Sequence, residues 1–153
     1  YKTMKKLVFI IVIVLCMTAC SNSNLGGEVV PDKKADIGEV SKMNIVIDNK
    51  KFDINLDNNE TVSELIDHLP LELTMNELNE NEKYAYLDFS LTTDEVNPKK
   101  IKSGDVMLFG DNCLVLFYRN FNTSYSYTRI GHIDNFDISD VSSDSINVKL
   151  EME

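Results

Sequence analysis

The sequence predicts an all-β domain with one short helix, folded as a closed barrel or a sandwich. Apolar and polar residues alternate with a period of two in several separate segments, which is typical of half-buried strands. Two further runs, at 106–109 and 113–118, are short and continuously apolar, as in strands that are buried on both faces. Only one segment has helical spacing. A succession of strands with a single helix favours a barrel or a sandwich.

The alternating pattern begins in residues 43–56, which we expect to form a β-hairpin. Apolar residues occupy every second position on either side of a turn at Asn49-Lys50. These residues are Met43, Ile45, Ile47, Phe52, Ile54 and Leu56. The domain is therefore expected to open with two strands that each turn one face toward the core.

The helix is expected directly after this hairpin. Thr61 and Glu64 have the spacing of a capping box, which satisfies free backbone N–H groups at a helix start. Apolar residues follow at i, i+3, i+4 and i+7, and Pro70 ends the segment. They are Val62, Leu65, Ile66 and Leu69. The pattern predicts one short helix that packs against the sheet.

Further strands are expected along the rest of the chain. The alternating or apolar segments lie at 71–75, 83–89, 106–109, 113–118 and 146–152. Gly110-Asp111-Asn112 joins the two continuously apolar runs, and a short loop between two such runs predicts a hairpin. Residues 120–130 form one more candidate extended segment.

The first twenty residues predict a lipoprotein signal peptide. Lys5 and Lys6 precede an apolar run over 7–17, which is shorter than the roughly 20 residues of a membrane-spanning helix. The run closes on Met17-Thr18-Ala19-Cys20, which resembles the lipobox of bacterial lipoproteins, whose cysteine becomes the lipidated first residue. We therefore expect cleavage after residues 1–19 and a lipid on Cys20. An ordinary secretory signal is the alternative.

This assignment predicts the location of the protein and excludes one class of partner. Acylated Cys20 would anchor the protein in the bilayer at the extracytoplasmic face of the cell membrane. Residues 20–42, polar and interrupted by glycine and proline, would be a flexible tether to one domain over 43–153. From Cys20 on, the chain has 12 basic and 25 acidic side chains, a formal charge of −13. We expect no nucleic-acid partner, because phosphate binding depends on lysine and arginine.

Three stretches, taken in order, resemble the small bacterial cyclophilin-like domains. They are the opening hairpin followed by ETVSELIDHLPLELTM, the aromatic segment EKYAYLDFSL, and the run GDVMLFGDNCLVLFYRNFNTSYSYTRIGHID. The resemblance implies a closed cyclophilin-like β-barrel of about eight mostly antiparallel strands with one short α-helix. It implies less about function, because one fold supports many activities.

Tyrosines and one arginine form the candidate ligand-binding surface. If 120–130 runs extended, Tyr125, Tyr127 and Arg129 share a face. Tyr84 and Tyr86 repeat the same spacing, so the barrel could bring four tyrosines and Arg129 to one concavity. Tyrosine and arginine are over-represented in binding sites. The predicted set is Arg129, Tyr127, Tyr125, Tyr118, Tyr86 and Tyr84.

Three interpretations of these residues are open. The favoured one is a non-enzymatic module that binds an unidentified small molecule or peptide. In a prolyl isomerase, Arg129 would weaken the resonance behind a rotation barrier of about 18–20 kcal/mol. The Phe-His-Arg and Gln-Gly-Gly-Asp runs of true cyclophilins are missing, however, and the chain has no glutamine. In a purely structural interpretation, the tyrosines fill a sheet face and Arg129 pairs with an acid.

The remaining reactive side chains predict no site. Cys113 lies within an apolar run and is expected to be buried rather than nucleophilic. His68 and His132 have no partners at metal-ligand spacing. The acidic stretch 134–140 lacks the glycine and the terminal glutamate of a calcium-binding EF-hand loop. We therefore expect no catalytic residue, no metal and no cofactor.

Overall fold

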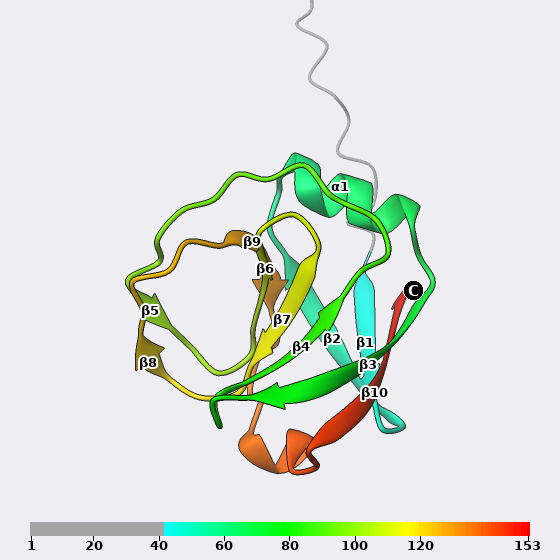
Figure 1. The fold of residues 1–153 in the computed structure, drawn as a ribbon. Coiled ribbons are helices and arrows are strands. Elements are labelled where there is room, and N and C mark those ends of the chain that lie inside the picture. The colour runs from blue at the N-terminus through cyan, green and yellow to red at the C-terminus, as the bar shows by residue number, and fades with distance from the viewer. Residues whose placement is uncertain (1–41) are drawn as a thin grey trace, which may run out of the picture. The chain divides into compact units, whose positions relative to one another are not determined.

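Strand pairing closes into a barrel in the computed structural model, which describes residues 42–153 (Figure 1). Eight strands follow the order β1-β10-β3-β4-β7-β6-β9-β2, and each is antiparallel to both neighbours. Their bounds are β1 Met43–Ile47, β2 Lys50–Leu56, β3 Leu71–Leu78, β4 Glu82–Tyr86, β6 Asp105–Phe109, β7 Cys113–Phe117, β9 Thr128–His132 and β10 Ser145–Met152. The predicted eight-stranded antiparallel barrel is confirmed.

The elements outside the barrel are few. The α-helix α1, Glu60–Asp67, lies over one end of the barrel, at the top of Figure 1. The short strands β5, Lys100–Ile101, and β8, Phe121–Asn122, pair with each other. A 3-10 helix, η1, spans Ile138–Val141. The predicted signal peptide, Cys20 and the tether up to residue 41 lie outside the described residues.

The opening hairpin forms as predicted, but its turn lies one residue earlier. β1 and β2 are joined by Asp48 and Asn49, with φ angles of 45° and 75°, rather than by Asn49-Lys50. Two positive φ angles are typical of the tight hairpin turns that match strand twist, and Asp and Asn tolerate them. Lys50 is therefore free to begin β2, where it pairs with Ile47.

The helix begins at a different cap from the one predicted. Asn59 is the N-cap, and its side-chain oxygen accepts a hydrogen bond from the Val62 backbone N–H at 2.9 Å. The predicted pair instead binds a distant loop: the Thr61 hydroxyl donates to the Thr92 carbonyl at 2.6 Å, and Glu64 accepts from the Thr92 backbone N–H at 2.6 Å. The capping-box prediction was wrong because tertiary hydrogen bonds use both side chains.

The two central strands β6 and β7 are buried on both faces, as their continuous apolarity predicted. Leu114 and Leu116 of β7 belong to the main core inside the barrel. The alternate residues of β7 lie in a second cluster on the outer surface, named here the outer cluster. It consists of Ile101, Met107, Cys113, Val115, Phe117 and Tyr127, with Tyr84 and Phe121 partly buried against it. The β5–β8 pair thus covers the outside of the central strands.

The sequence predicted one extended segment over 120–130, but the structure has two separate strands there. β8 and β9 are separated by residues 123–127, in which Tyr127 forms an isolated bridge to Val96. A bulge at Ile130 also interrupts the register of β9 with β6, since Val106 pairs with Gly131 and Met107 with Arg129. The simple two-residue period therefore does not extend from Tyr125 to Arg129.

Candidate functional site

Four of the predicted tyrosines line a single pocket outside the barrel, referred to as the tyrosine pocket. Its volume is about 370 Å³, which is in the range of sites for small molecules. Tyr84 and Tyr86 come from β4, whereas Tyr125 and Tyr127 come from the segment between β8 and β9. The other lining residues are Leu78, Asn79, Glu82, Phe109, Cys113 and Val115. The structure thus brings the two tyrosine pairs together.

The floor of the pocket is the outer face of β4 and β7. Alternation along β4 turns Glu82, Tyr84 and Tyr86 to the same face, because residues two apart in a strand share a face. In the register of these strands, Tyr84 is opposite Val115 and Tyr86 is opposite Cys113. Both partners belong to the outer cluster. The pocket therefore stands on a rigid, well-packed sheet.

The aromatic rings of the pocket contact one another. The ring centroids of Tyr84 and Tyr86 are 5.8 Å apart in an edge-to-face arrangement. The Phe109 ring lies 6.0 Å from that of Tyr125 and 5.7 Å from that of Tyr127. These separations fall within the range that aromatic pairs prefer. The aromatic side chains therefore support one another around the pocket.

The pocket is also where large apolar side chains reach solvent. Tyr86 and Tyr125 are 68% and 63% exposed, and Phe109 and Leu78 are 45% and 41% exposed. Within residues 42–153, only two other large hydrophobic side chains are comparably exposed. Single exposed apolar residues are ordinary, but a group of them around one concavity is typical of an interaction site.

Glu82 is the charged residue of the pocket, and it is not among the site residues predicted from the sequence. Burial raises the pKa of its carboxyl to about 7, with a smaller contribution from the charge of Glu77. The signal was present in the sequence, because Glu82 stands two positions before Tyr84 and four before Tyr86 in an alternating strand. Perturbed carboxyls in clefts are candidates for functional groups.

The field of Glu82 reaches two other groups of the pocket. Burial raises the pKa of the Cys113 thiol, and the Glu82 charge adds to the rise. Burial also raises the pKa of Tyr127, and the Glu82 charge adds to this rise. A hydrogen bond with the Thr123 side chain acts in the opposite direction and lowers the pKa. Cys113 is only 6% exposed, which confirms that it is buried. Its raised pKa keeps the thiol neutral, so the cysteine serves as an apolar floor.

Arg129 does not line the tyrosine pocket, contrary to the predicted grouping with the four tyrosines. Its Nε atom donates to Oδ2 of Asp57 at 2.7 Å, in a separate polar pocket that also includes Asp94 and Val96. The break between β8 and β9 separates the tyrosines from Arg129: Tyr127 forms an isolated bridge to Val96, whereas Arg129 lies within β9. The shared concavity therefore includes the tyrosines but not the arginine.

Tyr118 lies in a buried polar cluster away from the tyrosine pocket. Its hydroxyl contacts both carboxylate oxygens of Glu77 at 2.8 Å. The Lys83 Nζ atom donates to Glu77 at 2.6 Å and to the Ser143 carbonyl at 2.5 Å. Burial and the hydrogen bond to Glu77 raise the pKa of Tyr118 to about 12. This tyrosine connects strands within the barrel and does not line the tyrosine pocket.

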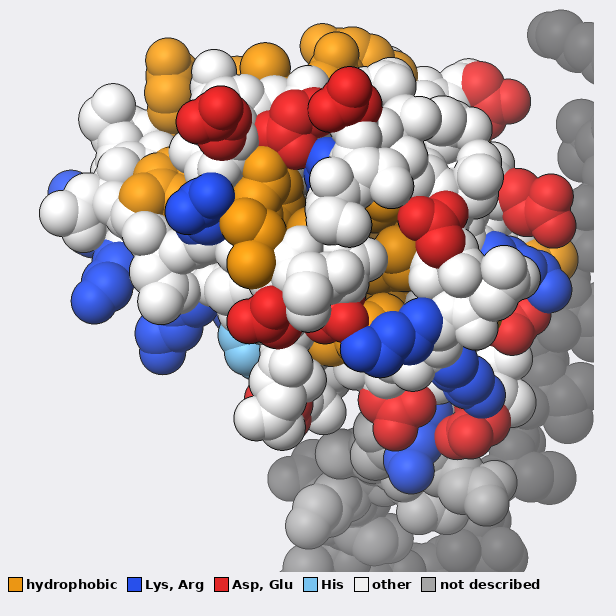
Figure 2. Space-filling model, turned by 90° about the horizontal axis from the view of Figure 1, so that it is seen from below, with side chains coloured by type: hydrophobic (Ala, Val, Ile, Leu, Met, Phe, Trp, Pro, Cys, Tyr) orange, Lys and Arg blue, Asp and Glu red, His pale blue; other side chains and the backbone are white. Residues whose placement is uncertain are grey.

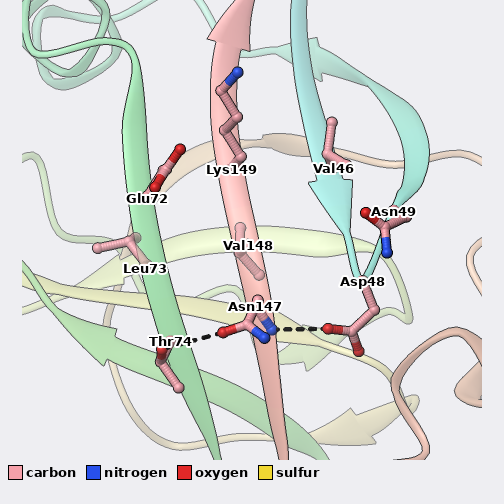
Figure 3. A pocket seen from close by; sticks show the side chains of 9 residues that line it. All are labelled: Val46, Asp48, Asn49, Glu72, Leu73, Thr74, Asn147, Val148 and Lys149. Atoms are coloured by element: carbon pink, nitrogen blue, oxygen red, sulfur yellow. Dashed lines mark hydrogen bonds between the residues drawn. The ribbon is translucent and has the colours of Figure 1, made fainter.

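A second concavity, of about 500 Å³, lies over β1, β3 and β10 (Figure 3). Asn147 stands at its centre and is bonded on both sides: its backbone N–H donates to Asp48 at 3.0 Å, and its side chain accepts from Thr74 at 3.3 Å. Its lining is mostly polar, with no aromatic residue. Because its central groups already bond to one another, it is a weaker candidate for a ligand site.

The two histidines and the acidic stretch 134–140 have structural partners. His132 Nδ1 lies 2.9 Å from Oδ1 of Asp105, and the His68 ring stacks on Phe89 at 3.6 Å. In the acidic stretch, Asp137 caps η1 and Asp140 pairs with Lys50. Among residues 42–153, no group of three or more His, Cys, Asp or Glu side chains is arranged to hold a metal ion.

The surface carries charges of both signs. Figure 2 shows acidic and basic side chains distributed around hydrophobic ones on the face seen from below. In the part of the chain that the structure describes, no helix has the length and apolarity needed to cross a membrane.

Comparisons with known proteins support the fold. The sequence profile of the cyclophilin-like family matches residues 45–153. The solution structure of a hypothetical protein from Archaeoglobus fulgidus is similar, with 20% sequence identity and a TM-score of 0.51 over 74% of this chain and 95% of that protein. No curated protein matches the chain. The profile covers most of the chain and coincides with the barrel, so the protein belongs to the cyclophilin-like family.

Proposed function

We propose that the protein is a membrane-tethered, extracytoplasmic binding module, and that its tyrosine pocket binds a small ligand or a peptide. The observation that carries the proposal is the gathering of exposed apolar side chains around one concavity, with Tyr86 and Tyr125 the most exposed. The lipobox-like ending at Cys20 supports the tether. The rigid floor on β4 and β7 supports binding without a large change of shape.

A binding module accounts for the geometry better than a prolyl isomerase does. Isomerase chemistry needs a donor beside the bound proline, and Arg129 was the predicted donor. Its Nε atom is bonded to Asp57, and it lies outside the tyrosine pocket. Within the pocket the side chains offer hydroxyl, thiol, amide and carboxyl groups, which suit recognition of a ligand. An assay of peptide isomerisation would overturn this preference if it showed acceleration that Tyr86→Ala abolishes.

The binding proposal is tested by a fragment screen with the full chain in a non-ionic detergent, read by NMR chemical shifts. Fragments should shift the resonances of residues lining the tyrosine pocket. The double variant Tyr86→Ala/Tyr125→Ala should lose these shifts, and it should fold normally because both side chains are exposed. Arg129→Ala is the matched control and should keep them. Hits that cluster elsewhere, or that survive the double variant, would move the site.

The tether is tested separately, by the fate of the protein in bacterial cells. The unaltered chain should incorporate labelled fatty acid and remain with the membrane fraction. Cys20→Ser should lose the label and enter the soluble extracytoplasmic fraction, because lipid would no longer hold the protein. Cys113→Ser is the control and should retain the label. Equal labelling of the Cys20→Ser variant and the unaltered chain would exclude lipidation at this position.

A further inference from the structure

The composition of the tyrosine pocket favours a positively charged ligand. Its ten lining residues include five aromatic rings and one acid, but no base. The face of an aromatic ring carries negative charge density and attracts cations, more strongly where water is excluded. The neighbouring base, Lys83, alternates to the other face of β4 and is bonded to Glu77 at 2.6 Å. No lining residue therefore neutralises the acid.

Glu82 is that acid, and it is held partly buried without a compensating donor from residues 42–153. Burial and the Glu77 charge both disfavour its ionised form, and no hydrogen bond opposes them. A desolvated carboxylate without a partner is unfavourable, whereas one that is paired with a cation is stabilised. A positively charged hydrogen-bond donor from a ligand would supply the missing partner.

The spacing along β4 suits a single ammonium group. Strands rise about 3.3 Å per residue, so the Cα atoms of Glu82 and Tyr84 are about 6.6 Å apart on one face. A cation–π contact extends to roughly 6 Å and a charged hydrogen bond to about 3 Å, so one ammonium can reach both the carboxylate and the ring of neighbours at this spacing. The remainder of the ligand would extend across the floor toward Tyr86, in a volume of about 370 Å³.

We infer that the ligand of the tyrosine pocket is a small organic cation, whose ammonium group lies between the Glu82 carboxylate and the Tyr84 ring. This inference rests on the proposed binding function and adds the chemical class of the ligand. The acidic balance of the chain, −10 overall, attracts the same class of ligand over a longer range.

The test compares two probes of nearly identical shape: butylammonium, and butan-1-ol, in which a hydroxyl replaces the charged ammonium. Both are titrated into the full chain in a non-ionic detergent at pH 8, with resonances of the tyrosine pocket as the readout. Butylammonium should bind at least about tenfold more tightly than the alcohol. Glu82→Gln should remove this difference. Glu72→Gln, in the concavity over β10, is the matched control and should preserve it.

The outcomes separate the failure of the cation inference from the failure of the proposed function. Equal affinity for both probes, or binding of neutral fragments alone, would contradict the inference that the ligand is a cation. The proposal that the pocket binds a ligand would still hold. If neither probe nor any fragment shifts the pocket resonances, both proposals fail. A short acetylated and amidated Gly-Lys-Gly peptide is the third arm. Tighter binding of this peptide than of butylammonium would replace the small molecule with a lysine side chain.

Discussion

The Nζ atom of Lys83 lies 2.6 Å from Oε2 of Glu77, and its side chain is only 2% exposed. The ammonium also donates to the Ser143 carbonyl and lies 5.6 Å from the centroid of the Tyr118 ring. Glu77 pairs with Lys83 in the register of β3 and β4, so the ion pair connects neighbouring strands. A buried charge with three such partners is a structural element of the barrel rather than a solvated one.

Replacing this lysine should destabilise the barrel more than replacing a surface lysine. Lys83→Met leaves the Ser143 carbonyl without this donor and leaves Glu77 with only the Tyr118 hydroxyl as a side-chain donor from residues 42–153, which we expect to lower the free energy of unfolding by about 2–3 kcal/mol. Lys149→Met is the matched control. Its partner Glu151 is at 2.6 Å, but both side chains are partly exposed, so the loss should be much smaller than for Lys83→Met. Urea denaturation measures both, and equal losses would contradict the structural role of Lys83.

Glu82 should make stability depend on pH in a direction opposite to that of most carboxyls. Its pKa is about 7 in the folded protein, against 4.5 ordinarily, so the folded state holds the proton more tightly. The contribution of the protonated Glu82 carboxyl to the free energy of unfolding is therefore complete below about pH 4.5, and it is lost as the pH rises to about 7. Glu82→Gln cannot ionise, so the variant should match the unaltered protein at pH 4.5 and exceed its stability at pH 8.

The size of this difference is bounded by the pKa of Glu82. One pKa unit corresponds to about 1.4 kcal/mol, and partial exposure reduces the effect, so we expect about 1–2 kcal/mol at pH 8. Thermal or urea unfolding at the two pH values measures it. Glu72→Gln tests whether the change is specific, because it should reproduce the unaltered pH profile. A Glu82→Gln variant that is less stable at pH 8 would show that the carboxylate has a folded-state partner.

The start of α1 provides a third prediction. The Asn59 side chain accepts from the Val62 backbone N–H at 2.9 Å and donates to the Arg129 carbonyl at 2.8 Å. Asn59→Ala removes both bonds and should destabilise the protein by about 1–2 kcal/mol, whereas Asn59→Asp keeps the cap and should lose less. Asn58→Ala, one residue earlier and exposed, should be neutral. If the two alanine variants unfold at the same urea concentration, Asn59 does not cap the helix.

The helix start also illustrates how far the sequence predicts this fold. Periodicity found the barrel strands, the helix and the hairpin at Gly110-Asp111-Asn112, because alternation and continuous apolarity follow directly from burial, but it missed the two-residue strands β5 and β8. It did not distinguish Asn59 from Thr61 as the cap. Thr61 and Glu64 have the spacing of a cap, but a loop 28 residues beyond Glu64 captures that carboxylate through Thr92. Such long-range contacts are not visible in a local pattern.

The candidate site was predictable to the same extent. The shared spacing of Tyr84-Ala85-Tyr86 and Tyr125-Ser126-Tyr127 correctly suggested that the four tyrosines meet, and they line one pocket. Arg129 was placed with them on a two-residue period, which fails because residues 123–127, between β8 and β9, do not form a strand. Whether these residues bind a ligand stays a prediction.

Two glycines give the last prediction, because they have similar backbone angles and different surroundings. Gly104 and Gly110 have φ angles of 93° and 60°, a region that residues with a Cβ rarely adopt. A Cβ at Gly104 would lie 2.2 Å from the Ile133 carbonyl oxygen. A Cβ at Gly110 would have no surrounding atom of residues 42–153 within 4 Å.

Alanine at these two positions should therefore have unequal effects. Gly110→Ala introduces only backbone strain and should cost about 1–2 kcal/mol. Gly104→Ala adds a collision with a backbone atom, which must move and disturb the hydrogen bond from Ile133 N–H to the Gly104 carbonyl, so we expect a loss of about 3 kcal/mol or more. Urea denaturation measures the stability of Gly110→Ala, and that of Gly104→Ala if this variant folds. If Gly104→Ala does not fold, the soluble yields of the two variants are compared instead. Equal stability of the two variants would mean that the contact between Gly104 and Ile133 is not tight in solution.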